Sequence, residues 1–187
     1  IGLGGAIMQA VTRNPLADPG ILGVNAGASF AVVLAIWAFG VGTTLGLVWF
    51  AMAGAAVASV VVYLLGSVGR GGATPVRLAL SGAALSALLF AFTRAITLLD
   101  EATLDQFRFW AVGSLAGRDG EVVSSIVWFI VIGVALAISL ARPLNAIGLG
   151  DDAAAALGVQ VGRTRALAGV AIVLLCGSSV AAIGPIA

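Results

Sequence analysis

Residues 44–66 read TLGLVWFAMAGAAVASVVVYLLG, an apolar run of 23 residues without a charge. A helix needs about 20 mainly apolar residues to cross the hydrocarbon core of a bilayer, so this run predicts a membrane-spanning helix. Apolar stretches of the same kind lie at 24–40, 76–99, 122–141 and 166–187. With residues 1–12, which read as the end of a further span, they predict an all-α, polytopic transmembrane helical bundle that forms one domain over residues 1–187. Because both ends of the chain are apolar, we expect spans to be missing at both ends.

The composition agrees with a chain that faces lipid. Hydrophobic residues make up 61% of the chain and charged residues 9%, whereas soluble domains carry about 25% charged residues. The net charge of +1 provides no strongly basic surface, so we expect no nucleic-acid partner. The chain has no histidine and one cysteine, Cys176, which cannot form an internal disulfide or a cysteine-based metal site. We therefore expect neither a metal nor a cofactor on this chain.

Arginine marks the expected cytoplasmic side of the membrane. Five of the nine basic residues, all of them arginines, fall in three alternate loops, at 13–23, 67–75 and 142–165. Arginine is enriched in short cytoplasmic loops, so these three loops are predicted to be cytoplasmic and the acidic segment 100–121 extracytoplasmic. Within that segment Leu104, Phe107 and Trp110 recur at helical spacing, which predicts a short amphipathic helix at the outer interface.

The segment 13–23, RNPLADPGILG, is the most distinctive part of the chain. Pro15 and Pro19 stop the preceding helix, and Asn14, which precedes a proline, is pushed out of helical geometry. Arg13 is suitably placed at a helix C-terminus, where a cation is favoured. With Asp18, these residues predict a rigid cytoplasmic elbow between two spans, and an ordinary tight turn is the alternative.

A second unusual segment, 142–158, reads RPLNAIGLGDDAAAALG. Pro143 is suited to the first turn of one short helix, and Asp151 and Asp152 to the start of a second, where negative charge is favoured. Gly158 is suited to closing that second helix. Two short helices at a membrane surface would form a docking site, with an interfacial loop as the alternative. The small apolar face of this site would consist of Ala153, Ala154 and Leu157.

These segments together resemble one known family. The stretch GAIMQA at 5–10 followed by RNPLADP at 13–19, then Leu144-Asn145, LGDDA at 149–153 and Leu157-Gly158, is similar to the hallmark pattern of the FecCD family of ABC importer permeases. Gly184-Pro185-Ile186 is similar to the start of another motif of that family. The resemblance covers essentially the whole chain, and family members carry iron-siderophores, haem or vitamin B12.

The resemblance implies an architecture and a set of site residues. Family permeases have ten spans and work as dimers, and this chain would hold the end of span two through span seven. The 142–165 loop would dock the ATPase. Its coupling residues would be Leu144, Asn145, Leu149, Gly150, Asp151, Asp152, Ala153, Leu157 and Gly158. The 100–121 segment, with Arg108 and Arg118, would lie near the docking surface for an extracytoplasmic substrate-binding protein. The 76–99 span would line the translocation path, with Thr74 near its cytoplasmic gate.

The resemblance also implies the partners and the location of the chain. ATP and Mg would be bound by a separate ATPase, and a second permease copy or homologue would complete the dimer in the bacterial inner membrane. The chain itself would be a transport subunit and not an enzyme. A P-loop requires a lysine, which this sequence lacks. Serine or metal intramembrane hydrolysis requires histidine, which it also lacks.

Arg94 keeps a second transport class open, because it is the charged residue farthest inside a predicted span. Ion-coupled secondary transporters carry ionisable residues at such depths. Arg94 fits either a side chain that reaches the outer interface or a cation that lines the path and meets an anionic siderophore. Ferric siderophore is the first choice of substrate, while haem and cobalamin stay open.

Overall fold

The computed structural model describes residues 1–68, 74–112 and 120–185, and the regular elements within them are helices. The helices are α1 (Gly2–Thr12), η1 (Pro19–Leu22), α2 (Val24–Phe39), α3 (Thr44–Ser67), α4 (Pro75–Leu99), α5 (Glu101–Val112), α6 (Gly120–Gly148), α7 (Asp151–Ala156), α8 (Val161–Ile172), η2 (Val173–Gly177) and α9 (Ser178–Ile183). The prediction of an all-α fold is confirmed.

Four helices of the described chain are long and apolar enough to cross a membrane. They are α3, α4, the Val122–Gly148 part of α6, and the continuous Val161–Ile183 segment formed by α8, η2 and α9. The helix expected at 24–40, α2, has 16 residues, or about 24 Å at 1.5 Å per residue. It matches the predicted run to within one residue and ends at Gly40, which has a left-handed conformation, so it is shorter than the four membrane-length helices.

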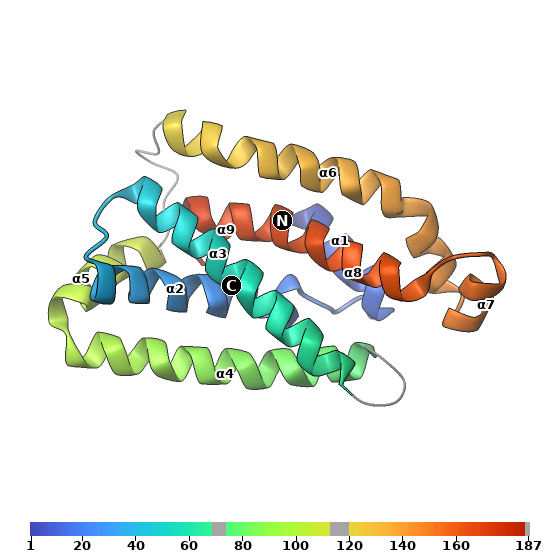
Figure 1. Cartoon of the computed structure of the whole chain (residues 1–187), viewed down its shortest axis with the longest axis horizontal. Coiled ribbons are helices and arrows are strands. Elements are labelled where there is room, and N and C mark those ends of the chain that lie inside the picture. The colour runs from blue at the N-terminus through green and yellow to red at the C-terminus, as the bar shows by residue number, and fades with distance from the viewer. Residues whose placement is uncertain (69–73, 113–119, 186–187) are drawn as a thin grey trace.

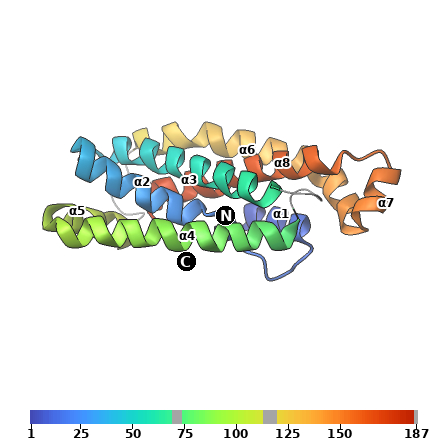
Figure 2. The same cartoon turned by 60° about the horizontal axis from the view of Figure 1, so that its bottom comes forward.

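The long helices form a bundle whose two ends differ. Figure 1 shows α4 and α6 on opposite sides of the bundle, with α3 crossing obliquely between them. The two short helices α5 and α7 lie at opposite ends of the long axis, and Figure 2 shows the same separation. The segments around α5 and α7 therefore lie at opposite ends of the bundle, and that they face opposite sides of the membrane stays a prediction.

The centre of the bundle is a close crossing of α2 and α3. A Cβ atom added to Gly27 would lie 3.0 Å from the carbonyl carbon of Gly54 and closer still to its oxygen. Ala51 and Ala55 of α3 are fully buried beside this crossing. Small residues let two helix backbones touch, which is how helices gain packing energy in a membrane. The outer faces of α4 and α6 instead expose large apolar side chains such as Leu80 and Trp128.

The helix α6 differs from the expectation for the 142–158 segment. Pro143 does not begin a separate short helix, because α6 continues through it to Gly148. Proline has no N–H for the carbonyl four residues earlier, and a helix accommodates the loss by bending. Figure 1 shows the last turns of α6 bending away from its axis. Within the described chain, α7 is therefore the one separate short helix of this segment.

A π-turn interrupts the last membrane-length segment. The five residues Val173–Gly177 form η2 between α8 and α9. A π-turn leaves backbone carbonyls without their usual partners. The hydroxyl groups of Ser178 and Ser179 donate to the carbonyl of Leu175 at 3.2 and 2.8 Å. These serines therefore satisfy local backbone acceptors within the helix.

Candidate functional site

The elbow, residues 13–23, is held by its own hydrogen bonds. Asn14 Oδ1 accepts from the Leu16 N–H at 3.0 Å, and Asp18 Oδ1 accepts from the Gly20 N–H at 2.7 Å. Asp18 thereby caps η1, and the buried Pro19 opens it. These side chain to backbone bonds replace helical bonds at turns. The elbow is therefore a structured segment and not a simple two-helix turn.

The helices α3 and α4 contact the C-terminal end of the elbow, at Ile21 and Leu22. The buried Ser59 hydroxyl of α3 donates to the carbonyl oxygen of Leu22 at 3.1 Å. On α4, a Cβ atom added to Gly82 would lie 2.8 Å from the carbonyl carbon of Ile21 and closer still to its oxygen. The backbones of η1 and α4 are therefore in direct contact, and this contact needs the absence of a side chain at Gly82.

We expect Ser59→Ala to lower the free energy of unfolding of the permease by about 1 kcal/mol, since it leaves a buried carbonyl without its donor. The matched control is Ser67→Ala on the same helix, because the Ser67 hydroxyl donates to the carbonyl of Leu64 within its own helix at 2.8 Å. Thermal unfolding of the purified full-length proteins measures both changes. Equal melting temperatures for the two variants would contradict the expected role of Ser59.

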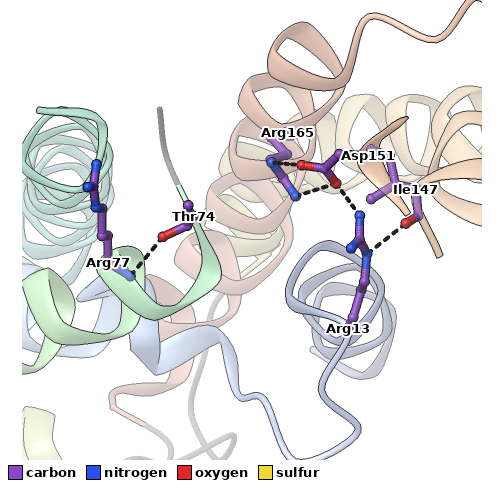
Figure 3. Close-up of polar contacts among 6 residues, drawn as sticks. All are labelled: Arg13, Thr74, Arg77, Ile147, Asp151 and Arg165. Carbon is purple, nitrogen blue, oxygen red and sulfur yellow. Dashed lines mark hydrogen bonds and ion pairs between the residues drawn. The ribbon is translucent and has the colours of Figure 1, made fainter. Parts of the chain in front are cut away.

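The near end of the elbow meets the 142–165 segment in an ion cluster, which we define as Arg13, Asp151 and Arg165 (Figure 3). Arg13 Nη2 pairs with Asp151 Oδ1, and Arg13 Nε donates to the Ile147 carbonyl oxygen at 2.7 Å. Arg165 of α8 forms a bidentate pair with the same carboxylate. Its Nη1 donates to Asp151 Oδ2 and its Nη2 donates to Oδ1, each at 3.0 Å. One aspartate therefore connects the end of α1, the start of α7 and the first turns of α8.

The charges of the ion cluster suit the helix ends around it. Arg13 lies against the last carbonyls of α6 and Asp151 is the first residue of α7, so each charge complements the local helix dipole. Two guanidinium groups share one carboxylate, so the cluster keeps one positive charge in excess. The Arg165 side chain is 11% exposed and its Nε has no partner among the described residues. Arg165 is therefore the buried anchor of the cluster, and Arg13 is its half-exposed member.

The other expected coupling residues divide into an inner and an outer set. Leu144 is buried within the chain. Ala154, which the sequence predicted on an exposed apolar face with Ala153 and Leu157, is also buried, so that prediction is wrong for Ala154. Helical periodicity turns Ala154 inward when α7 packs on α6 and α8. The exposed members are Asn145, Leu149, Asp152, Ala153, Leu157 and Gly158. Gly150 and Gly158 have positive φ angles of 118° and 83° at the two ends of α7, which glycine adopts readily.

The residues predicted for the path and for binding-protein docking lie apart from this cluster. Thr74 caps α4, and its hydroxyl accepts from the Arg77 N–H at 3.5 Å (Figure 3). Arg94 is exposed toward the other end of α4. Arg108 on α5 pairs with Asp105 at 3.2 Å and lies 5.7 Å from the centre of the Phe109 ring. Arg118 lies outside the described residues.

The amphipathic helix expected near the outer interface is present as α5. Trp110 is 5% exposed and stacks on Phe107 with 5.8 Å between ring centres. Gln106 Nε2 donates to the Val41 carbonyl oxygen at 3.2 Å, which ties α5 to the loop between α2 and α3.

Across residues 1–68, 74–112 and 120–185, no group of three or more His, Cys, Asp or Glu side chains is placed to hold a metal ion.

The helical bundle, its membrane-length helices and its structured loop define a polytopic helical membrane protein. A family model described as the FecCD transport family matches residues 1–187. The chain belongs to the FecCD transport family, and the resemblance predicted from its motifs is confirmed.

Curated relatives and a solved structure share this assignment. The chain is 49% identical over 187 residues to the ferric enterobactin transport system permease protein FepD of Escherichia coli (strain K12), covering 100% of this chain and 56% of FepD. It is 42% identical over 186 residues to the Fe(3+)-citrate import system permease protein YfmD of Bacillus subtilis (strain 168), covering 100% of this chain and 55% of YfmD. A solved structure described as an inward-facing conformation of a metal-chelate type ABC transporter matches with a TM-score of 0.88 and 29% identity, over 99% of this chain and 59% of that one. The chain thus spans about half the length of the curated relatives it matches.

Proposed function

We propose that this chain is part of the transmembrane subunit of an ATP-binding cassette importer, which moves a ferric siderophore across the bacterial inner membrane by alternating access. The family match over the whole chain carries the proposal. The names of the relatives support the cargo, because FepD is named for ferric enterobactin and YfmD for Fe(3+)-citrate. Both cargoes are iron chelates, so the substrate class is a chelated ferric ion and not a bare one.

The α7 end of the bundle is the proposed docking surface for the ATPase. Leu149 and Leu157 flank α7 and are 73% and 66% exposed. Apolar side chains at the centre of a small surface are typical anchors for a partner's groove. The ion cluster holds the start of α7 against α1 and α8. A partner that pushes on α7 would therefore act on the spans directly, while ATP and Mg stay on the partner.

The helix α4 is the proposed wall of the translocation path. Its exposed apolar residues, such as Leu80 and Leu88, are suited to an apolar path or to a second permease copy or homologue. Arg94 on the same helix is exposed. A cation at this place would attract the carboxylates or catecholates of an anionic ferric chelate. The α5 end, with Arg108, would face an extracytoplasmic substrate-binding protein.

We expect Leu157→Asp to weaken binding of the cognate ATPase by about tenfold or more, because it places a charge in an apolar contact. The matched control is Val112→Asp, since Val112 is 80% exposed and lies on α5 at the opposite end of the bundle. Pull-down of the full-length permease with its ATPase measures the difference. Equal binding by the two variants would place the ATPase elsewhere.

The transport proposal is tested by uptake into vesicles that hold the full-length permease, its ATPase and its binding protein. The substrate panel is a ferric catecholate, a ferric hydroxamate, haem and cobalamin. We expect ATP-dependent uptake of a ferric siderophore. Uptake of haem or cobalamin alone would overturn the substrate class. Uptake that follows an ion gradient without the ATPase would replace the importer by an ion-coupled secondary transporter.

A further inference from the structure

The elbow touches both the proposed docking segment and the proposed path helix. At its first residue, Arg13 reaches the Ile147 carbonyl oxygen and the Asp151 carboxylate. Eight positions later, the carbonyl of Ile21 lies directly against Gly82 of α4. The helices α6 and α7 therefore meet α4 through this short segment.

The segment between these two contacts is built to keep its shape. The Ala17 N–H donates to the backbone carbonyl oxygen of Asn14, and the Ile21 N–H donates to that of Asp18, each at 3.1 Å. The Asn14 and Asp18 side chains each close a further turn, at 3.0 and 2.7 Å. Two prolines remove backbone freedom within the same segment. A displacement at Arg13 is therefore carried to Ile21 and is not absorbed by bending between them.

The two contacts differ in strength, and the difference gives them separate roles. At Gly82 two backbones touch with no side chain between them, so α4 cannot move relative to η1 without losing that packing. At Arg13 the contact is polar and half-exposed, with side-chain exposures of 37% for Arg13 and 45% for Asp151. A forked polar contact of this kind can turn with α7 without losing its acceptors, so it can pass a shift of α7 to the elbow. The contact at Gly82 is therefore a fixed attachment, and the contact at Arg13 is an adjustable one.

We propose that the elbow is the mechanical link through which the α7 segment sets the position of α4, with Arg13 as its positioning residue. The inference rests on the proposed function, in which an ATPase docks at α7. Arginine is needed because its guanidinium donates to the Ile147 carbonyl and to Asp151 at once, through Nε and Nη2. The single ammonium of a lysine is a point charge and does not reproduce this fork.

The test follows the movement of α4 in the full-length permease bound to its ATPase in lipid nanodiscs. A cysteine replaces the exposed Leu80 of α4, and its rate of thiol labelling is measured with and without ATP trapped on the ATPase. The native Cys176 is buried and remains in place. The variants are Arg13→Ala and Arg13→Lys. The matched control is Leu16→Ala, because Leu16 lies in the elbow between the two contacts and its side chain is 88% exposed.

We expect ATP to change the labelling rate about fivefold or more in the permease that carries only Leu80→Cys and in the same protein with Leu16→Ala, a typical size for coupling between two sites. In Arg13→Ala the change should fall below about twofold, while ATPase binding and hydrolysis persist. Arg13→Lys should give an intermediate value, and it serves as the readout if Arg13→Ala does not fold. An unreduced response in the Arg13 variants would overturn the link and leave the importer proposal standing. An unaltered permease that fails to bind any ATPase would overturn the importer proposal and the link together.

Discussion

Replacing Gly82 by alanine is expected to abolish most uptake. It is also expected to lower the free energy of unfolding of the permease more than any other substitution proposed for this chain. The added Cβ would lie 2.8 Å from the Ile21 carbonyl carbon and closer to its oxygen. Both partners are backbone, so neither can rotate aside, and η1 or α4 must move. Overpacking of this kind costs about 1–3 kcal/mol and occasionally more, and we expect at least the upper value here.

The matched control for Gly82→Ala is Gly169→Ala. Gly169 lies inside α8, and a Cβ atom added to it would meet nothing within 4 Å. Alanine is favoured over glycine in a helix by about 1 kcal/mol, so this variant should be neutral or slightly stabilised. Thermal unfolding and ATP-dependent uptake of the full-length proteins measure both variants. A Gly82→Ala protein as stable as the Gly169→Ala protein would show that η1 and α4 are not in backbone contact.

Asp151→Ala is expected to produce the second largest effect, because it leaves two arginines without their shared partner. The largely buried Arg165 guanidinium would lose both of its hydrogen bonds to the carboxylate. Hydrogen bonds to charged groups contribute about 1.5–3 kcal/mol, and the 45% exposure of Asp151 places the expected loss near the lower value. We also expect ATP-dependent uptake to fall by about tenfold or more, since the start of α7 would no longer be held to α1 and α8.

The neighbouring Asp152 provides a control of the same charge. Asp152 is exposed and makes no ion pair within the described chain. Asp152→Ala should therefore leave the melting temperature of the permease unchanged when no ATPase is present. If both variants melted at the same temperature, the ion cluster would contribute nothing to the fold.

The spans were predictable from sequence because lipid imposes a simple length rule. Mainly apolar runs of bilayer length appear as α3, α4, α6 and the α8–α9 segment. The ends of these helices were less predictable. Pro143 indicated a boundary, yet α6 continues beyond it by bending. The end of α2 at Phe39, by contrast, lies within one residue of the end of the 24–40 run. Pro143 permits either a helix end or a bend, and the tertiary packing selects the bend.

The ion cluster was not predictable from sequence, although two of its members were singled out. Arg13 and Asp151 were each placed at a helix end, where their charges are favoured. Their contact joins residues 138 positions apart, and helical periodicity carries no information about such a distance. Arg165 was assigned only to a loop, yet α8 begins at Val161 and turns it into a buried side chain. A search for opposite charges at expected helix ends would have found the Arg13–Asp151 pair.

Arg13 is also the one residue other than glycine, within the described chain, that has a positive φ angle, at 52°. A left-handed backbone costs an ordinary L-residue about 1–2 kcal/mol, and helices commonly end there with glycine. Local backbone preference and the long-range contact therefore select for different amino acids at this position. A protein engineer who optimised this position for backbone conformation would choose glycine, which adopts the left-handed conformation at the end of α1 with less strain. The same choice would delete the guanidinium and its contacts to Ile147 and Asp151, so the relief of the backbone would come with the loss of the link to α7.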